Sequence, residues 1–484
     1  MYLGLDVGTS GLRALLVDGS GAVVGEAEAS YPVAHPAPGW SEQDPADWIA
    51  ACEATIAHLR ADHPKAFAAL RGIGLSGQMH GATLLDAEGA ILRPCILWND
   101  TRSYAEAQAL DATPGVRERS GNIVFPGFTA PKLAWVARHE PEVFDRVAKV
   151  LLPKDYVRHW LTGDFIGDMS DCAGTSWLDT GTRDWSETLL AAGGMRRDQM
   201  PDLVEGSAPG GQVRGALLSA WGLSGPVVVA GGAGDNAAAA CGAGCFRDGQ
   251  GFVSLGTSGV LLAAKDSYAP DPASAVHTFC HAVPDTWYQM GVILAATDCL
   301  NWLSRTLRRE PGELASRLPD SVTGPSPILF LPYLSGERTP HNDSAIRATF
   351  AGIDIADGPA ELTQSVMEGV AFALRDCHEA LKGTGTTLPS LLAVGGGTRS
   401  RFWVETLATV LNLPLDLPAK GEFGAALGAA RLAIAADTGD PLSEIMGAPE
   451  ISHTIDPRAD LAPAYDEAYA RYRALYPQMK AILT

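Results

Sequence analysis

The chain has 484 residues, of which 46% are hydrophobic and 19% charged, a composition that excludes a disordered or fibrous protein. Its 36 basic and 56 acidic residues give a net charge of −20, so no nucleic acid partner is expected, because the phosphate backbone would be repelled. At roughly 150 residues per domain, this length predicts about two to four domains.

The start of the chain, MYLGLDVGTS, is typical of a strand and lacks the features of a signal peptide. No stretch approaches the roughly 18 apolar residues that a membrane span needs, so no membrane partner is expected. The 8 cysteines are scattered without Cys-x-x-Cys or zinc-like spacing, which predicts reduced thiols. These features together predict a cytoplasmic protein.

Two distant segments share Gly-Thr-Ser-Gly between apolar runs: LGLDVGTSGLRALLVD at 3–18 and GFVSLGTSGVLLAAK at 251–265. The alternating apolar residues predict β-hairpins, and the glycines permit a tight turn with outward-pointing N–H groups. This repeat predicts two related domains, residues 1–247 and 248–484. Both halves alternate strand-like runs with helical patterns, which predicts an α/β fold.

Glycine-rich turns follow three strand-like runs, where a backbone free of side chains can approach phosphate oxygens. The P-loop sequence is absent, since the chain contains no Gly-Lys dipeptide. The candidate phosphate-binding residues are Gly8, Thr9, Ser10, Gly256, Thr257, Ser258, Gly395, Gly396 and Gly397. Similar turns in both halves predict a nucleotide bound between two domains.

Asp6 ends the first strand, directly before the first of these turns. A carboxylate beside phosphates repels them unless a cation intervenes, which favours Mg²⁺ at this position. The alternative is that Asp6 only fixes the turn by accepting backbone N–H bonds.

Two short polar segments are candidates for substrate binding. Gln78, Met79 and His80 lie on a turn between Gly77 and Gly81, although a lone histidine is more often a surface or core residue. Trp98–Arg102 combines an aromatic face with hydrogen-bonding groups, as polyhydroxylated ligands require. Its alternative is a structural cluster at a helix start, with Asp100 as the cap.

The stretch at 225–244 allows three interpretations of Asp235. Gly232-x-Gly234-x-x-Ala237 resembles a dinucleotide-binding fingerprint, but a carboxylate at that helix start would oppose a pyrophosphate. Asp235 is also a suitable cap for the alanine-rich helix. A third role is that of a general base that accepts the proton of a substrate hydroxyl as it attacks the γ-phosphorus.

In their order along the chain, these segments resemble the FGGY family of carbohydrate kinases over nearly the whole length. The motifs that carry the resemblance are GLDVGTSGLRALLVD, PGWSEQDPADW, SGQMHG, LWNDTR, GFTAPKLAWV, SDCAGTSWLD, GGAGDNAAAA, LGTSG, PYLSGERTPHND, ELTQSVMEGVAFAL and AVGGGTRS. The resemblance implies two actin/Hsp70-type, ribonuclease H-like domains with the active site in the cleft between them.

The resemblance also implies phosphorylation of a sugar hydroxyl by ATP with Mg²⁺. It implies that Asp235 is the catalytic base and Asp6 the metal-associated carboxylate. The turns at Gly8–Ser10 and Gly256–Ser258 would bind phosphates, and Gly395–Gly397 would lie at the nucleoside. The residues expected to contact the sugar are Met79, His80, Asp235 and Asn236.

The pair Met79–His80 is typical of family members that phosphorylate the ketose D-xylulose, whereas glycerol kinases carry Arg-Glu there. Gly127 stands where glycerol kinases have tyrosine, which would leave room for a longer sugar. The expected activity is therefore phosphorylation of D-xylulose at the 5-hydroxyl. A kinase for another ketose or polyol, and an actin-like nucleotide switch without kinase activity, are the alternatives. The resemblance further suggests a homodimer.

Overall fold

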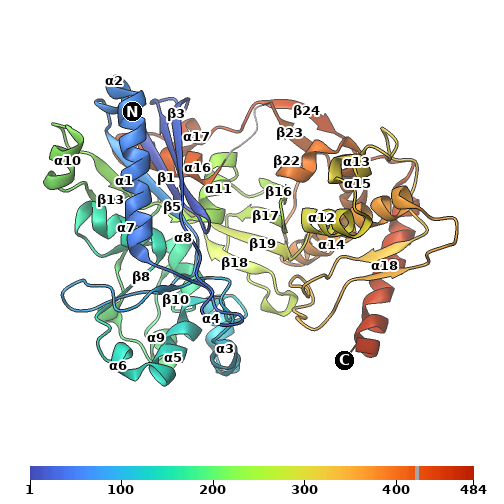
Figure 1. The fold of residues 1–484 in the computed structure, drawn as a ribbon, viewed down its shortest axis with the longest axis horizontal. Coiled ribbons are helices and arrows are strands. Elements are labelled where there is room, and N and C mark those ends of the chain that lie inside the picture. The colour runs from blue at the N-terminus through green and yellow to red at the C-terminus, as the bar shows by residue number, and fades with distance from the viewer. Residues whose placement is uncertain (420–423, 484) are drawn as a thin grey trace.

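The computed structural model describes residues 1–419 and 424–483, which form two lobes, each built around a seven-stranded sheet (Figure 1). The first sheet contains β13 (Pro209–Gln212), β14 (Val228–Ala230), β5 (Gly72–Gly77), β1 (Tyr2–Val7), β2 (Gly11–Val17) and β3 (Val23–Ser30) in spatial order, with β15 (Ala233–Gly234) also paired to β5. The second contains β18 (His277–Cys280), β19 (Trp287–Ile293), β17 (Gly259–Lys265), β16 (Gly251–Leu255), β22 (Leu391–Val394), β23 (Leu415–Pro418) and β24 (Ile451–Ile455).

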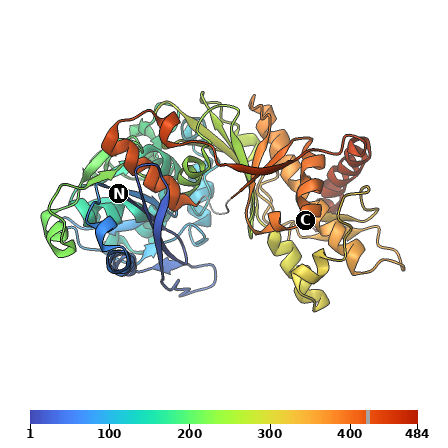
Figure 2. The same ribbon diagram turned by 90° about the horizontal axis from the view of Figure 1, so that it is seen from above.

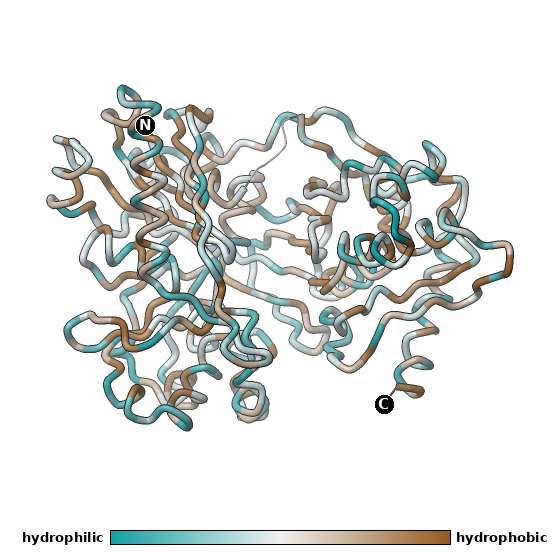
Figure 3. Tube along the Cα trace, in the orientation of Figure 1, coloured by the Kyte–Doolittle hydropathy of each residue, from teal (hydrophilic) through white to brown (hydrophobic). Residues whose placement is uncertain are grey.

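Helices cover both sheets, as the α/β prediction requires. Those of the first lobe include α1 (Pro45–Asp62), α5 (Thr129–His139), α7 (Pro153–Thr162) and α11 (Asp235–Ala243). Those of the second include α12 (Thr297–Leu307), α14 (Pro359–Gly383), α15 (Arg401–Leu411) and α18 (Ala462–Leu483). Hydrophobic stretches follow the strands inside both lobes, where they are covered from solvent (Figure 3).

Both predicted hairpins are confirmed. In the first, β1 and β2 pair antiparallel with Asp6 opposite Arg13, and in the second β16 and β17 pair with Leu255 opposite Gly259. The opening strand of each hairpin also pairs in parallel with a later strand, β1 with β5 and β16 with β22. The same arrangement in both lobes agrees with the predicted relationship between the two halves.

Helix α16 (Ala425–Thr438) belongs to the later half of the sequence but packs on the sheet of the first lobe (Figure 2). Glycines permit this contact: a Cβ on Gly74 would lie 1.8 Å from the carbonyl oxygen of Ala429. A Cβ on Gly428 would lie 1.8 Å from the carbonyl oxygen of Ala238, so α16 and α11 also cross closely. The chain therefore returns to its first lobe near its end. The division of the chain into domains at residues 1–247 and 248–484 remains a prediction.

In the described part of the chain, no helix has both the length and the apolar character needed to cross a membrane.

Candidate active site

The two aspartates that the sequence singles out meet at one edge of the first sheet. Strands β1, β5 and β15 run parallel, with Ser76 of β5 opposite both Asp6 and Ala233. Parallel strands end on the same side of a sheet, so Asp6 and Asp235, the first residue of α11, come to the same edge. The topology thus assembles groups that are more than 200 positions apart.

Asp6 is held by a side chain and does not fix the turn that follows it. Ser76 Oγ donates to Asp6 Oδ1 over 2.9 Å, and burial raises the pKa of this carboxyl above its ordinary value. The turn is closed instead by the Gly8 amide, which donates to the carbonyl oxygen of Gly11 over 3.0 Å. The carboxylate is therefore available for another role.

Asp235 lies in the first turn of α11, where Gly234 is the N-cap residue, so it does not cap the helix. Its Oδ1 accepts the Asn236 amide at 2.7 Å and Asn236 Nδ2 at 2.8 Å, whereas Oδ2 receives no hydrogen bond from a described residue. Burial, and after it the negative charge of Asp6, raises the pKa of Asp235 to about 7. A carboxylate with this pKa and one free oxygen is suited to accept a proton near neutral pH.

A buried ionic cluster supports the backbone in front of Asp235. The Gly234 amide donates to Ser170 Oγ over 3.2 Å, and this hydroxyl donates to Asp168 Oδ2 over 2.5 Å. Lys154 Nζ lies 2.7 Å from the other oxygen of Asp168, and both side chains are fully buried. The motif SDCAGT contains Ser170, but sequence reasoning assigned this residue no role, because its partners are distant in the chain.

Met79 packs against the residue that precedes Asp235, and His80 follows Met79 in the chain. Gly234 packs on Met79, since a Cβ at that glycine would lie 2.9 Å from Met79 Cγ. The His80 ring stacks on Phe128 with 4.4 Å between centroids, and its Nδ1 lies 2.7 Å from the carbonyl oxygen of Gly174.

The protonation of His80 follows from these surroundings. Burial, and after it the positive charge of Lys132, lowers the pKa of His80 to about 3. The ring is therefore neutral, with Nδ1 donating to the carbonyl oxygen of Gly174. Its Nε2 remains a hydrogen-bond acceptor for a substrate hydroxyl.

The first candidate phosphate turn is anchored by side chains from several elements. Gln43 Nε2 donates to the carbonyl oxygen of Thr9 over 2.6 Å. The Tyr31 hydroxyl donates to the carbonyl oxygen of Gly8 over 2.6 Å. Trp98 Nε1 donates to Thr9 Oγ1 over 2.9 Å. Gln78, although placed on the polar turn, is buried and donates to Gln43 Oε1 over 2.8 Å, so it supports the turn instead of facing a ligand.

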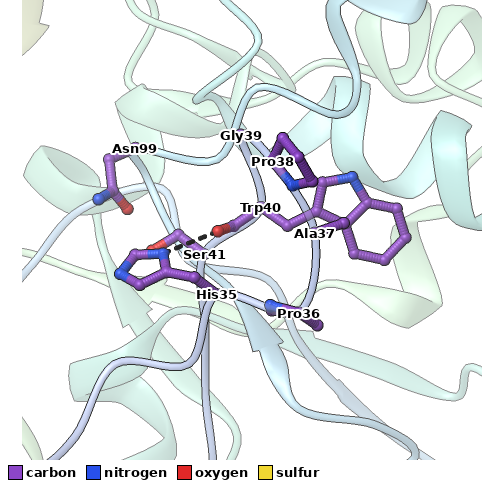
Figure 4. Close-up of a pocket in the computed structure, with 8 residues that line it drawn as sticks. All are labelled: His35, Pro36, Ala37, Pro38, Gly39, Trp40, Ser41 and Asn99. Atoms are coloured by element: carbon purple, nitrogen blue, oxygen red, sulfur yellow. Dashed lines mark hydrogen bonds between the residues drawn. The ribbon is translucent and has the colours of Figure 1, made fainter.

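The segment Trp98–Arg102 divides into a structural and an exposed part. Asp100 is buried and binds the Arg102 guanidinium through both oxygens, so it is an ion-pair partner and not a helix cap. The guanidinium lies 3.6 Å from the centroid of Trp40. Asn99 lies at a surface hollow of about 580 Å³ beside the loop at 35–41, facing His35 (Figure 4).

In the second lobe, the two predicted nucleotide segments lie together. Gly395 has a φ of 93°, and a Cβ there would lie 2.7 Å from the Leu255 carbonyl oxygen, so the backbone after β22 touches the start of the second turn. Thr297 Oγ1 donates to the Gly256 carbonyl oxygen over 2.8 Å, which fixes this turn to the first residue of α12. The structure thus brings Gly256–Ser258 and Gly395–Gly397 to one place.

A cavity of about 470 Å³ is lined by both lobes. His80 and the segment at 125–128 come from the first lobe, and Leu294, Glu337 and Arg338 from the second. Glu337 and Arg338 belong to PYLSGERTPHND, which the sequence analysis noted without assigning roles. A sugar bound beside His80 would therefore contact both lobes.

Comparisons with known proteins agree with this architecture. The model of the N-terminal domain of the FGGY family of carbohydrate kinases matches residues 1–242, and that of the C-terminal domain matches 251–436. The chain is 44% identical over 487 positions to the xylulose kinase of Escherichia coli K12, with 100% of both chains covered. It is 47% identical to the xylulose kinase of Klebsiella pneumoniae, with 90% of this chain and 89% of the relative covered.

Solved structures show the same fold along the whole chain. A xyloylose kinase from Brucella ovis superimposes with a TM-score of 0.98 at 59% identity, covering 99% of both chains. A gluconate kinase from Lactobacillus acidophilus superimposes with a TM-score of 0.92 at 25% identity, covering 100% of this chain and 98% of that one. The predicted two-domain kinase fold is confirmed, and the chain belongs to the FGGY family of carbohydrate kinases.

Proposed function

We propose that the protein transfers the γ-phosphoryl group of ATP to the 5-hydroxyl of D-xylulose, forming ADP and D-xylulose 5-phosphate. The observation that carries this proposal is the environment of Asp235, whose pKa is about 7, whose Oδ2 accepts from no described residue, and whose neighbour Gly234 packs on Met79. The xylulose kinases of Escherichia coli and Klebsiella pneumoniae support the choice of sugar.

Asp235 acts as the general base in this reaction. The 5-oxygen of the sugar attacks the γ-phosphorus, the bond from that phosphorus to the β,γ-bridging oxygen breaks, and the hydroxyl proton passes to Asp235 Oδ2. Met79 and Asn236 border this position, and His80 Nε2 accepts a hydrogen bond from another sugar hydroxyl. Closure of the lobes would exclude water, which would otherwise compete as the phosphoryl acceptor.

Backbone amides of the two glycine-rich turns bind the phosphates. Gly8–Ser10 belongs to the lobe that carries Asp235, and Gly256–Ser258 belongs to the opposite lobe, so the triphosphate would lie between them. Preorganised N–H groups stabilise the charge that develops on the transferring group. Gly395–Gly397, in contact with the second turn, borders the nucleoside.

Asp6 fits a Mg²⁺ ion, since its carboxylate directly precedes the first glycine-rich turn and offers hard oxygen donors. Mg²⁺ supplies charge neutralisation at the β- and γ-phosphates when bound. Among the described residues no group of three or more His, Cys, Asp or Glu side chains could hold a metal ion, so substrate phosphates and water would have to supply the other ligands. Homodimer formation stays a prediction.

A coupled ADP-release assay with Mg-ATP tests the proposal. The panel consists of D-xylulose, L-xylulose, D-ribulose, L-ribulose, glycerol, D-fructose and D-gluconate, the last because a structural neighbour is a gluconate kinase. We expect the highest kcat/KM with D-xylulose. A clear preference for another compound would reject the sugar assignment while leaving the family membership intact.

A further inference from the structure

Arg338 is a charged side chain of the second lobe that faces the cavity between the lobes. It lines this space of about 470 Å³ together with His80 of the first lobe. Among the described residues Arg338 forms no ion pair, and the nearest carboxyl that acts on its charge is that of the adjacent Glu337. An unpaired guanidinium in a cavity is costly unless a ligand supplies acceptors.

Two aromatic side chains hold the guanidinium in place. Its central carbon lies 4.3 Å from the centroid of Phe125, which belongs to the first lobe. Its Nη1 lies 3.4 Å from Nε2 of His277, the first residue of β18. Burial, and after it the charge of Arg338, lowers the pKa of His277, so the neutral ring accepts this hydrogen bond. The remaining donors of Arg338 are thus preorganised.

The neighbouring carboxyl of Glu337 does not balance this charge. Its Oε1 accepts the backbone amide of Arg338 over 2.6 Å and that of Leu294 over 3.4 Å. Burial raises the pKa of Glu337 to about 8, so the group is largely protonated at neutral pH. The positive charge therefore remains available to a ligand.

The cavity adjoins residues that lead in the chain to the neighbourhood of Asp235. Met79 touches Gly234, the residue before Asp235, and His80 follows Met79 into the cavity. Resting on the proposed function, which places the 5-hydroxyl at Asp235, we propose that Arg338 binds the opposite end of the ketose, the 2-carbonyl and 1-hydroxyl oxygens. These two oxygens on adjacent carbons suit the paired donors of a guanidinium.

This contact would couple sugar binding to closure of the two lobes, because the bound sugar would touch Arg338 of the second lobe and His80 of the first. It also favours ketoses over polyols, which lack the carbonyl acceptor. Loss of a charge-assisted pair corresponds to roughly 10–100-fold in kcat/KM.

The test compares Arg338→Met with the wild-type protein on D-xylulose and on 1-deoxy-D-xylulose, which lacks the 1-hydroxyl. We expect kcat/KM for D-xylulose to fall about 10–100-fold, mainly through KM for the sugar, with KM for ATP unchanged. Removing the 1-hydroxyl should cost the wild-type protein much more than it costs the variant, because the variant has already lost the donor.

Arg347→Met is the matched control, since Arg347 is exposed and, within the described chain, donates only to the backbone carbonyl oxygens of Ser344 and Ile346. It should behave as wild type. A wild-type protein inactive on D-xylulose would reject the proposed function itself. An active wild type with Arg338→Met within twofold of it, or equal losses from the deoxy sugar in both proteins, would overturn only the role of Arg338.

Discussion

Asp235 combines a pKa near neutrality with a buried carboxylate oxygen that no described residue occupies. Both arise from its surroundings, because burial disfavours the charged form, Asp6 repels it, and Asn236 occupies only Oδ1. Its chemistry therefore depends on a few neighbours that the fold brings to one sheet edge.

Asp235→Asn should lower kcat by about 10²–10⁴-fold, the usual contribution of a general base. The affinity for sugar should change much less, since the amide keeps the size of the side chain. Steady-state kinetics with D-xylulose and Mg-ATP measure both effects. A variant that retains at least half of the wild-type rate would show that Asp235 is not the base.

The same residue should make stability depend on pH. Its folded-state pKa of about 7 lies above the ordinary 3.8, so its contribution to stability is present below pH 3.8 and is lost as the pH rises through 7. The gain in stability of Asp235→Asn over wild type should therefore be near zero below pH 3.8, grow to on the order of 4 kcal/mol between pH 3.8 and 7, and stay constant above pH 7. Urea unfolding at several pH values measures this gain. The exposed Asp320→Asn is the control, and an equal gain in it would contradict the explanation.

At the level of elements, α11 is positioned by groups outside its own sequence. Ser170 links the Gly234 amide to Asp168 and Lys154, and α16 crosses α11 at Gly428. Ser170 thus fixes the start of α11, and α16 packs against the rest of the helix.

Ser170→Ala should lower kcat about 5–10-fold and the free energy of unfolding by about 1–2 kcal/mol, because a buried amide and a buried carboxylate each lose a partner. Kinetics and urea unfolding measure the two effects. Thr55→Val removes a comparable buried hydroxyl from α1 and should lower stability without lowering kcat. If both variants lose kcat equally, Ser170 has no specific positioning role.

At the scale of the whole molecule, the ligands are expected to bind between lobes that share one cavity. Sugar and nucleotide together should therefore draw the lobes closer. Asp235→Asn permits the measurement, because it would hold both substrates with little turnover.

Small-angle scattering of Asp235→Asn should give a smaller radius of gyration with D-xylulose and Mg-ATP together than without ligands. Mg-ATP with a sugar that the enzyme does not phosphorylate is the control. An unchanged radius with the correct pair would contradict closure on substrate binding.

The sequence by itself determined the two hairpins, the α/β class and the family, because strand periodicity, glycine turns and ordered motifs are local properties of the chain. It also singled out Asp6 and Asp235 before any contact was known. It did not show that Gln78 supports a turn, that Asp100 pairs with Arg102, or that α16 returns to the first lobe. Tertiary structure decided these points, since each depends on which distant segments pack together and on the burial that results.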